Sequence, residues 1–200
     1  RNFYICSYGG SGSKMICNYL KHYGKVYHIH SPKPPIKLTY IGNENGSNTY
    51  FEWFNNIQIP DEELHNYTVI FIYRNPVNAI YSRFKNPNHL EHIQVNRNIK
   101  LIDILRSKKD LYKISEFYDN YCNSNSNNNR NYNIYCIKYE TIFDNFSELH
   151  KVLKLSPNIN NNLIPIKKEN NHTRICENDL QKIYKDLITK MNNNKPIFIV

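Results

Sequence analysis

The segment that most constrains the fold is residues 3–20, where an apolar run, a glycine-rich run and an amphipathic run follow one another. Residues 3–7 are rich in aromatic and branched side chains, which predicts a buried strand, and residues 15–20 have apolar side chains at helical spacing. A glycine-rich turn between a strand and a helix is typical of a phosphate or sulfate site. Its N–H groups and the positive end of the helix face the same space. The simpler alternative is a tight strand-to-helix connection.

The residue types of this turn, YGGSGSKM, fit an anion bound without a metal. Glycine permits the backbone conformations in which successive N–H groups converge, and the serines and the lysine add donors and charge. A magnesium-dependent kinase has Ser or Thr after the lysine, whereas Met15 follows Lys14 here. The strand predicted at residues 68–73 ends in Arg74, where a magnesium site prefers an acidic residue. The predicted anion-binding residues are Gly9, Gly10, Ser11, Gly12, Ser13, Lys14 and Arg74.

Strands and helices are predicted to alternate along the rest of the chain. This order predicts a three-layer α/β sandwich with a mainly parallel sheet and with ligands at the carboxyl ends of the strands. We expect one domain over residues 1–200, with the Asn-rich residues 123–131 as a surface loop. Residues 196–200 form either an edge strand or the opening of a further domain. Other strands are expected at residues 26–29, 68–73 and 132–138, and helices near residues 50–56, 76–84, 89–105, 111–121, 146–155 and 180–191.

Charge and cysteine content give only broad indications of the ligand type and the compartment of the protein. The net charge of +9 attracts a polyanion, a membrane surface or a highly charged small ligand. The basic residues are dispersed and match no nucleic-acid-binding module, so we do not expect a nucleic-acid partner. The five scattered cysteines favour a reducing, cytoplasmic compartment, and no run approaches the roughly 18 apolar residues of a membrane span. The chain begins at Arg1, so a Golgi lumen location is the alternative if upstream segments have been removed.

Two motifs together resemble those of the sulfotransferase family. Residues 7–15, SYGGSGSKM, resemble the family's strand–loop–helix that holds the 5′-phosphosulfate, and residues 72–84, IYRNPVNAIYSRF, resemble its Arg-Asn-Pro segment. The resemblance implies a P-loop-like fold and the co-substrate 3′-phosphoadenosine 5′-phosphosulfate. In the family a serine eight residues after the arginine shares the 3′-phosphate with it, and Arg74 and Ser82 have that spacing. A planar guanidinium with several donors suits this task.

The resemblance fails at one position of the loop. The Pro-Lys pair of the family corresponds to Gly9-Gly10, so the lysine that balances charge on the bridging oxygen is missing. Lys14 either replaces that charge from the first helical turn, as a catalytic residue, or is solvated. The chain is therefore either a sulfotransferase acting on a hydroxyl of a carbohydrate, protein or small molecule, or an inert nucleotide-binding module of the same fold. A nucleotide kinase is the less favoured third hypothesis.

The resemblance also implies a general base and further donor contacts. His30-Ser31-Pro32 resembles the His-x-Pro setting of the family's catalytic histidine, and His28 points to the same side of the predicted strand. Some branches of the family use a glutamate, which leaves Glu52 and Glu63 as alternatives. Tyr139-Glu140 resembles a structural Tyr-Glu pair that follows a strand in the family. Residues 166–187 loosely resemble the loop and helix that cover the donor, which implies that Lys167 or Lys168 contacts the 3′-phosphate. The acceptor and the oligomeric state stay open.

Overall fold

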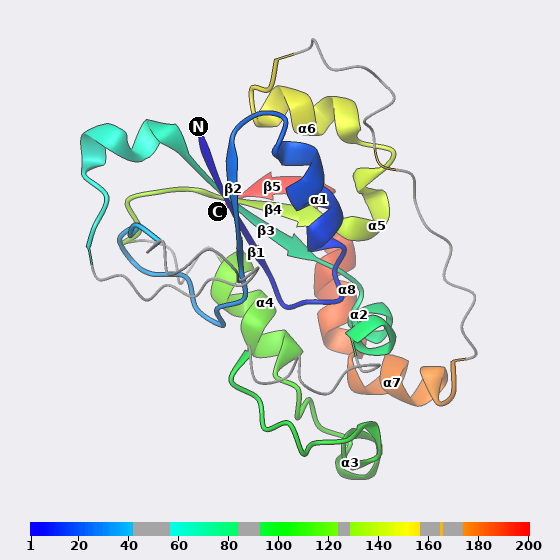
Figure 1. Cartoon of the computed structure of the whole chain (residues 1–200). Coiled ribbons are helices and arrows are strands. Elements are labelled where there is room, and N and C mark those ends of the chain that lie inside the picture. The colour runs from blue at the N-terminus through cyan, green and yellow to red at the C-terminus, as the bar shows by residue number, and fades with distance from the viewer. Residues whose placement is uncertain (42–56, 84–92, 124–128, 157–164, 166–173) are drawn as a thin grey trace.

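Five strands form one sheet in the computed structural model of the chain, with helices on both faces (Figure 1). The strands are β1 (Asn2–Ser7), β2 (Lys25–Ile29), β3 (Tyr67–Tyr73), β4 (Ile134–Lys138) and β5 (Ile197–Ile199). The structure describes residues 1–41, 57–83, 93–123, 129–156, 165 and 174–200.

The sheet is parallel except at one edge. Its order is β2-β1-β3-β4-β5, and β5 pairs antiparallel with β4, so residues 197–199 form an edge strand. The chain adds β2 on one side of β1 and then crosses to add β3 on the other side, so the strand order reverses between β1 and β3. Open α/β sheets bind ligands in the crevice at the carboxyl end of such a switch point. The loops that follow β1 and β3 are the two that carry the predicted anion-binding residues.

Alternating side chains of the strands supply both faces of the core. Tyr4 and Phe71 belong to one buried cluster, which also includes residues of α4, α7 and α8. Phe3 and Ile70, their neighbours along the same strands, belong to a second cluster with residues of α1, α5 and α6. This alternation follows from the two-residue period of a strand. The predicted α/β fold with a mainly parallel sheet and helices on both faces is therefore confirmed (Figure 1).

The helices begin and end close to the predicted positions in most cases. They are α1 (Ser13–Leu20), η1 (Asp61–Asn66), α2 (Pro76–Arg83), α3 (Leu101–Ser107), α4 (Ile114–Cys122), α5 (Tyr139–Ile142), α6 (Phe146–Val152), α7 (Glu177–Ile183) and α8 (Lys185–Asn193). The short η1 and α5 were not predicted. None of the described helices combines the length and the apolar character that a membrane crossing requires.

One predicted helix is much shorter in the structure than its apolar spacing indicated. Among residues 94–105, which the structure describes, only those from Leu101 onward are helical. The Asn96 side chain accepts a hydrogen bond from the N–H of Asn98 at 2.9 Å, a local turn that competes with helix formation. Asp103 accepts one from the N–H of Lys100 at 2.8 Å and so fixes the helix start at residue 101. The helix predicted at residues 50–56 lies outside the described residues.

Candidate anion-binding site

The glycine-rich loop between β1 and α1 turns its carbonyl groups toward donors of the protein. These hydrogen bonds come from side chains and from the first turn of α1. Arg83 donates to the carbonyl of Tyr8, and the Ser11 hydroxyl donates to the carbonyl of Gly9 at 3.2 Å. Arg74 donates to the carbonyl of Gly10 at 3.1 Å, and the N–H of Met15 donates to the carbonyl of Gly12 at 3.0 Å. The loop conformation is therefore held by its own surroundings, before any ligand is considered.

The N–H groups of the same loop are not used in this way. Among the described residues, none accepts a hydrogen bond from the backbone N–H of Gly9, Gly10, Ser11 or Gly12. Gly10 and Gly12 both have a left-handed backbone, with φ of 65° and 75°. Such a run of N–H groups before a helix forms a concave, electropositive site for an anion. Anion binding by this loop stays a prediction, and these N–H groups are the donors that it would use.

Two of the glycines are required by close packing as well as by φ. A Cβ atom on Gly10 would lie 2.6 Å from the carbonyl oxygen of Ala79 on α2. A Cβ atom on Gly12 would lie 2.0 Å from the ring of Tyr139, at the end of β4. Real Cβ atoms do not approach other atoms so closely, and the left-handed φ adds strain to any other residue type. A lysine at position 10, as the family resemblance leads one to expect, is not compatible with this loop.

Arg74 joins the loop after β3 to the glycine-rich loop after β1. Its Nη1 donates to the carbonyl of Gly10 at 3.1 Å, and its guanidinium lies over the ring of Tyr139, 4.7 Å from the centroid. The Nε atom lies 3.9 Å from Oε1 of Glu140, which is beyond hydrogen-bond distance. Burial lowers the pKa of Arg74 and the Glu140 carboxylate opposes that shift, so the guanidinium is a desolvated cation.

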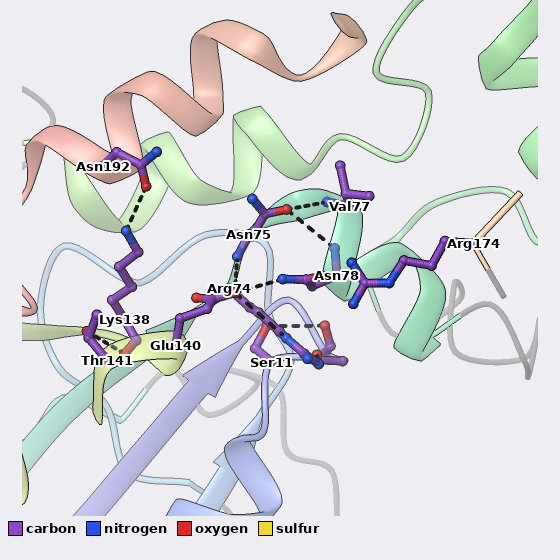
Figure 2. Close-up of polar contacts among 12 residues, drawn as sticks. Ser11, Arg74, Asn75, Val77, Asn78, Lys138, Glu140, Thr141, Arg174 and Asn192 are labelled. Atoms are coloured by element: carbon purple, nitrogen blue, oxygen red, sulfur yellow. Dashed lines mark hydrogen bonds and ion pairs between the residues drawn. The ribbon is translucent and has the colours of Figure 1, made fainter. Parts of the chain in front are cut away.

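Glu140 fixes the start of α2 next to Arg74. Its Oε1 accepts hydrogen bonds from the N–H of Asn75 at 2.9 Å and from the side chain of Asn78 at 3.2 Å (Figure 2). The Asn75 side chain in turn accepts from the N–H of Val77 at 3.0 Å, as an N-cap residue does. Within the described part of the chain, Nε of Arg74 and Oε2 of Glu140 are buried without a hydrogen-bond partner. The Nε–H group of Arg74 is therefore a donor that a ligand could use, whereas Glu140 stabilises the start of α2.

A second arginine approaches the same place from the start of α7. Figure 2 shows the Arg174 side chain directed toward Asn78 on α2. Arg174 forms an ion pair with Glu177 at 2.9 Å, and its charge contributes to the lowered pKa of Arg74. Two guanidinium groups that repel one another are stabilised when an anion binds between or beside them. Sequence reasoning did not assign Arg174 a site role, because the distance from residue 174 to α2 depends on the tertiary fold.

Ser82, which the resemblance assigns to the 3′-phosphate, is exposed, whereas the next residue, Arg83, is buried against the glycine-rich loop. Ser82 is exposed on α2, and its hydroxyl makes no hydrogen bond to a described residue. Arg83 is buried, donates to the Tyr8 carbonyl and lies over the Tyr8 ring at 5.0 Å. The structure thus brings Arg83 to the glycine-rich loop, whereas joint binding of one phosphate by Arg74 and Ser82 stays a prediction. The buried face of α2, which also contains Ile80, is the signal that identifies Arg83.

Two histidines reach the loop from β2, the neighbour of β1. His28 and His30 lie on the same side of β2, with ring centroids 4.3 Å apart. Nδ1 of His30 lies 2.8 Å from the carbonyl of Ser7, so the protonated nitrogen is Nδ1 and the acceptor lone pair is on Nε2. Nε2 of His28 lies 2.8 Å from the hydroxyl of Ser13, which accepts a hydrogen bond from the Ser7 hydroxyl at 2.9 Å. The predicted base is therefore linked to the predicted anion site.

The remaining predicted residues are distributed as follows. Lys14 is exposed in the first turn of α1. Burial is the larger cause of the lowered pKa of His28, and the charge of Lys14 contributes to it. Glu63 lies in η1, before β3, and accepts a hydrogen bond from Tyr40 at 2.8 Å. It is therefore at the amino edge of the sheet, opposite the glycine-rich loop, and does not fit a base at this site. Lys167, Lys168 and Glu52 lie outside the described residues.

Comparisons of this chain with protein-family models, with curated proteins and with solved structures found no match. The site is therefore interpreted from its own residues. It combines loop N–H groups that no described residue accepts, the desolvated cation Arg74 and the imidazole of His30 at the carboxyl edge of a parallel sheet.

Proposed function

We propose that the chain is a sulfotransferase that moves a sulfuryl group from 3′-phosphoadenosine 5′-phosphosulfate to an acceptor hydroxyl, within a P-loop-like sulfotransferase fold. The observation that carries the proposal is the hydrogen bond from Arg74 to the Gly10 carbonyl, at 3.1 Å. It joins the two segments that resemble the family's donor-binding motifs at the switch point between β1 and β3.

The chemistry of the site supports a donor with two separate anionic groups. The N–H groups of residues 9–12 and the positive end of α1 suit the 5′-phosphosulfate. Arg74 and Arg174 suit the 3′-phosphate, because a bound anion relieves their mutual repulsion and the buried Nε of Arg74 has no hydrogen-bond partner among the described residues. The proposed binding mode uses only backbone and side-chain donors.

The proposed transfer step uses His30 as the general base. Nε2 of His30 takes the proton of the acceptor hydroxyl while the acceptor oxygen forms a bond to sulfur. The bond between sulfur and the bridging oxygen breaks, which gives the sulfate ester and adenosine 3′,5′-bisphosphate. The loop N–H groups and Lys14 stabilise the charge that develops on the departing phosphate. The hydrogen bond between His30 and the Ser7 carbonyl holds the imidazole in the tautomer that this step requires.

An inert nucleotide-binding module is the second candidate, and one observation favours it. The hydroxyls of Ser11 and Ser13 are already used inside the protein, with Gly9 and with the Ser7 and His28 side chains. Position 10 has no room for the lysine of the family. Transfer chemistry then depends on Lys14 and the backbone alone. Binding of the donor and transfer of its sulfuryl group are therefore measured separately.

Titration calorimetry with adenosine 3′,5′-bisphosphate in the presence of a chelator tests donor binding. We expect binding to the parent chain, weakened about tenfold to a hundredfold by Arg74→Ala, because a hydrogen bond to a charged group contributes about 1.5–3 kcal/mol. Arg74→Lys keeps the charge without the planar fork and should fall between the two. Arg106→Ala, an exposed arginine on α3, is the matched control and should bind normally.

Binding that requires ATP and magnesium, or equal binding by parent and Arg74→Ala proteins of equal thermal stability, would contradict the proposal. Transfer of radiolabelled sulfate then separates the enzyme from the inert module. Lys14→Gln should lower the transfer rate about a hundredfold if Lys14 stabilises the leaving group. Lys21→Gln, at the other end of α1, is the control and should leave it unchanged.

A further inference from the structure

A cavity of about 330 Å³ lies beside the candidate site, between the segment that follows β2 and the start of α4. This volume is at the lower end of the range for small-molecule sites. The cavity begins at the residue after His30, and Phe117 on its floor contacts the ring of Tyr8 in the glycine-rich loop, with centroids 5.5 Å apart. Its lining includes Ser31, Lys33, Gln94, Lys113, Glu116 and Phe117.

The wall next to His30 is held in place by α4. The side chain of Asn120 donates to the carbonyl of Pro32 at 3.0 Å, and the Tyr121 hydroxyl donates to the carbonyl of Ser31 at 2.8 Å. Both donors lie on the same helix as Glu116 and Phe117. The two sides of the cavity are therefore fixed relative to one another without a ligand, which lowers the cost of binding one.

The backbone is strained at two residues of the lining. Gln94 and Lys113 have φ of 57° and 56°, in the left-handed region that residues other than glycine rarely adopt. Such residues persist only where the surrounding structure requires them, and they cluster at binding and active sites. Here both strained residues line the same cavity.

The lining of the cavity offers both polar and apolar surface. Lys33, Gln94, Lys113 and Glu116 are exposed. The apolar residues Ile93, Tyr112 and Phe117, at most 3% exposed overall, line the same cavity. A sugar ring has hydroxyl groups at its edge and C–H groups on its faces, so it suits a lining of both kinds. Its hydroxyl groups would hydrogen-bond to the amide and carboxylate side chains.

The charges of the lining select an anionic ligand. Lys113 lies 3.7 Å from Glu116, and the pair is neutral overall. Lys33, in contrast, forms no ion pair with a described residue. One ammonium group at the rim therefore remains for a carboxylate of the ligand, while the Gln94 and Glu116 side chains suit hydroxyl groups.

We propose that this cavity binds a hydroxylated carboxylate of the sugar-acid class, with Lys33 on the carboxylate. Its role as the acceptor in sulfuryl transfer rests on the proposed function, because only then does a hydroxyl next to His30 become an acceptor. Its role as a binding site does not depend on that function. The two roles are tested by different readouts on the same protein.

Ligand-observed NMR titration with D-glucuronate, and with D-glucose as the neutral comparison, tests the binding site. We expect saturable binding of glucuronate and weaker binding of glucose. Lys33→Gln should weaken glucuronate about threefold to fivefold, as expected for a partly exposed ion pair, and should leave the glucose signal unchanged. Lys37→Gln removes an exposed lysine of the same segment that does not line the cavity, so it should behave like the parent. An oligosaccharide ending in glucuronate distinguishes a polysaccharide terminus from the free sugar acid, according to which binds more tightly.

Equal binding of glucuronate and glucose, or equal loss in Lys33→Gln and Lys37→Gln, would overturn the assignment. Arg74→Ala should leave glucuronate binding unchanged while it weakens adenosine 3′,5′-bisphosphate. If the nucleotide fails to bind and glucuronate still responds to Lys33→Gln, the proposed function fails and the cavity assignment stands. If the nucleotide binds normally and Lys33→Gln changes nothing, the cavity assignment alone fails.

Discussion

At the scale of single residues, His28 lies between the ring of His30 and the Ser13 hydroxyl of the glycine-rich loop. Burial and, to a smaller extent, the nearby Lys14 charge together lower the pKa of His28 from its usual 6.5 to about 4. The imidazole is therefore neutral at physiological pH. Its Nε2 lies 2.8 Å from the Ser13 hydroxyl, and a neutral ring suits an acceptor at that atom. Protonation of His28 would remove this acceptor next to the glycine-rich loop.

The depressed pKa of His28 makes the stability of the protein depend on pH. Between about pH 6.5 and pH 4 the unfolded chain binds a proton that the folded chain excludes, so the free energy of unfolding falls as the pH is lowered. The full contribution of this residue is present above pH 6.5, and up to about 3 kcal/mol is lost by pH 4. We expect His28→Gln to reduce this slope in urea unfolding measured from pH 4 to pH 7. His22→Gln, an exposed histidine, is the control. An unchanged slope in His28→Gln would show that the ring is solvated.

At the scale of elements, the conformation of the glycine-rich loop depends on its neighbours α2 and α5 as much as on its own sequence. The carbonyl of Ala79 and the ring of Tyr139 occupy the space where side chains at positions 10 and 12 would begin. Arg83 and Arg74 stabilise this loop conformation by donating hydrogen bonds to its carbonyl groups. The N–H groups of residues 9–12 donate to no described residue, and we propose that they bind the anion.

Substitution of Gly10 tests this arrangement of elements. We expect Gly10→Lys to lower the free energy of unfolding by about 2–3 kcal/mol, through left-handed strain and the clash with the Ala79 carbonyl. Gly10→Ala should cost about as much, because the Cβ atom causes both effects. Asn18→Lys adds the same charged side chain at an exposed position of α1 and should change stability by less than about 0.5 kcal/mol. Denaturant unfolding measures all three, and a stable Gly10→Lys protein would contradict this loop conformation.

At the scale of the whole molecule, the strands were predictable and their order was not. The runs near residues 3–7 and 68–73 are apolar throughout, since parallel strands in this sheet are covered on both faces. Strand order depends on which face of the sheet each connecting helix crosses. The local spacing of apolar residues contains no information about that crossing. Helix boundaries were predicted best where apolar spacing was uninterrupted and worst near Asn96, where a side-chain turn replaced the helix.

The candidate site was predictable where residues adjacent in sequence form it. The glycine-rich loop and Arg74 are of this kind, because both directly follow predicted strands. Arg83 and Arg174 were missed because their partners are distant in sequence. Arg83 contacts Tyr8, 75 positions away, and Arg174 acts on Arg74, about 100 positions away. The cavity next to His30 was missed for the same reason, since its lining comes from three separate segments.

The most direct test of the account is a crystal structure of the protein with adenosine 3′,5′-bisphosphate. The account predicts the 5′-phosphate within hydrogen-bond distance of the N–H groups of residues 9–13. It predicts the 3′-phosphate beside the guanidinium of Arg74, with Arg174 as a second contact. A nucleotide bound away from the β1–β3 switch point, or phosphates that contact neither the glycine-rich loop nor Arg74, would contradict the account.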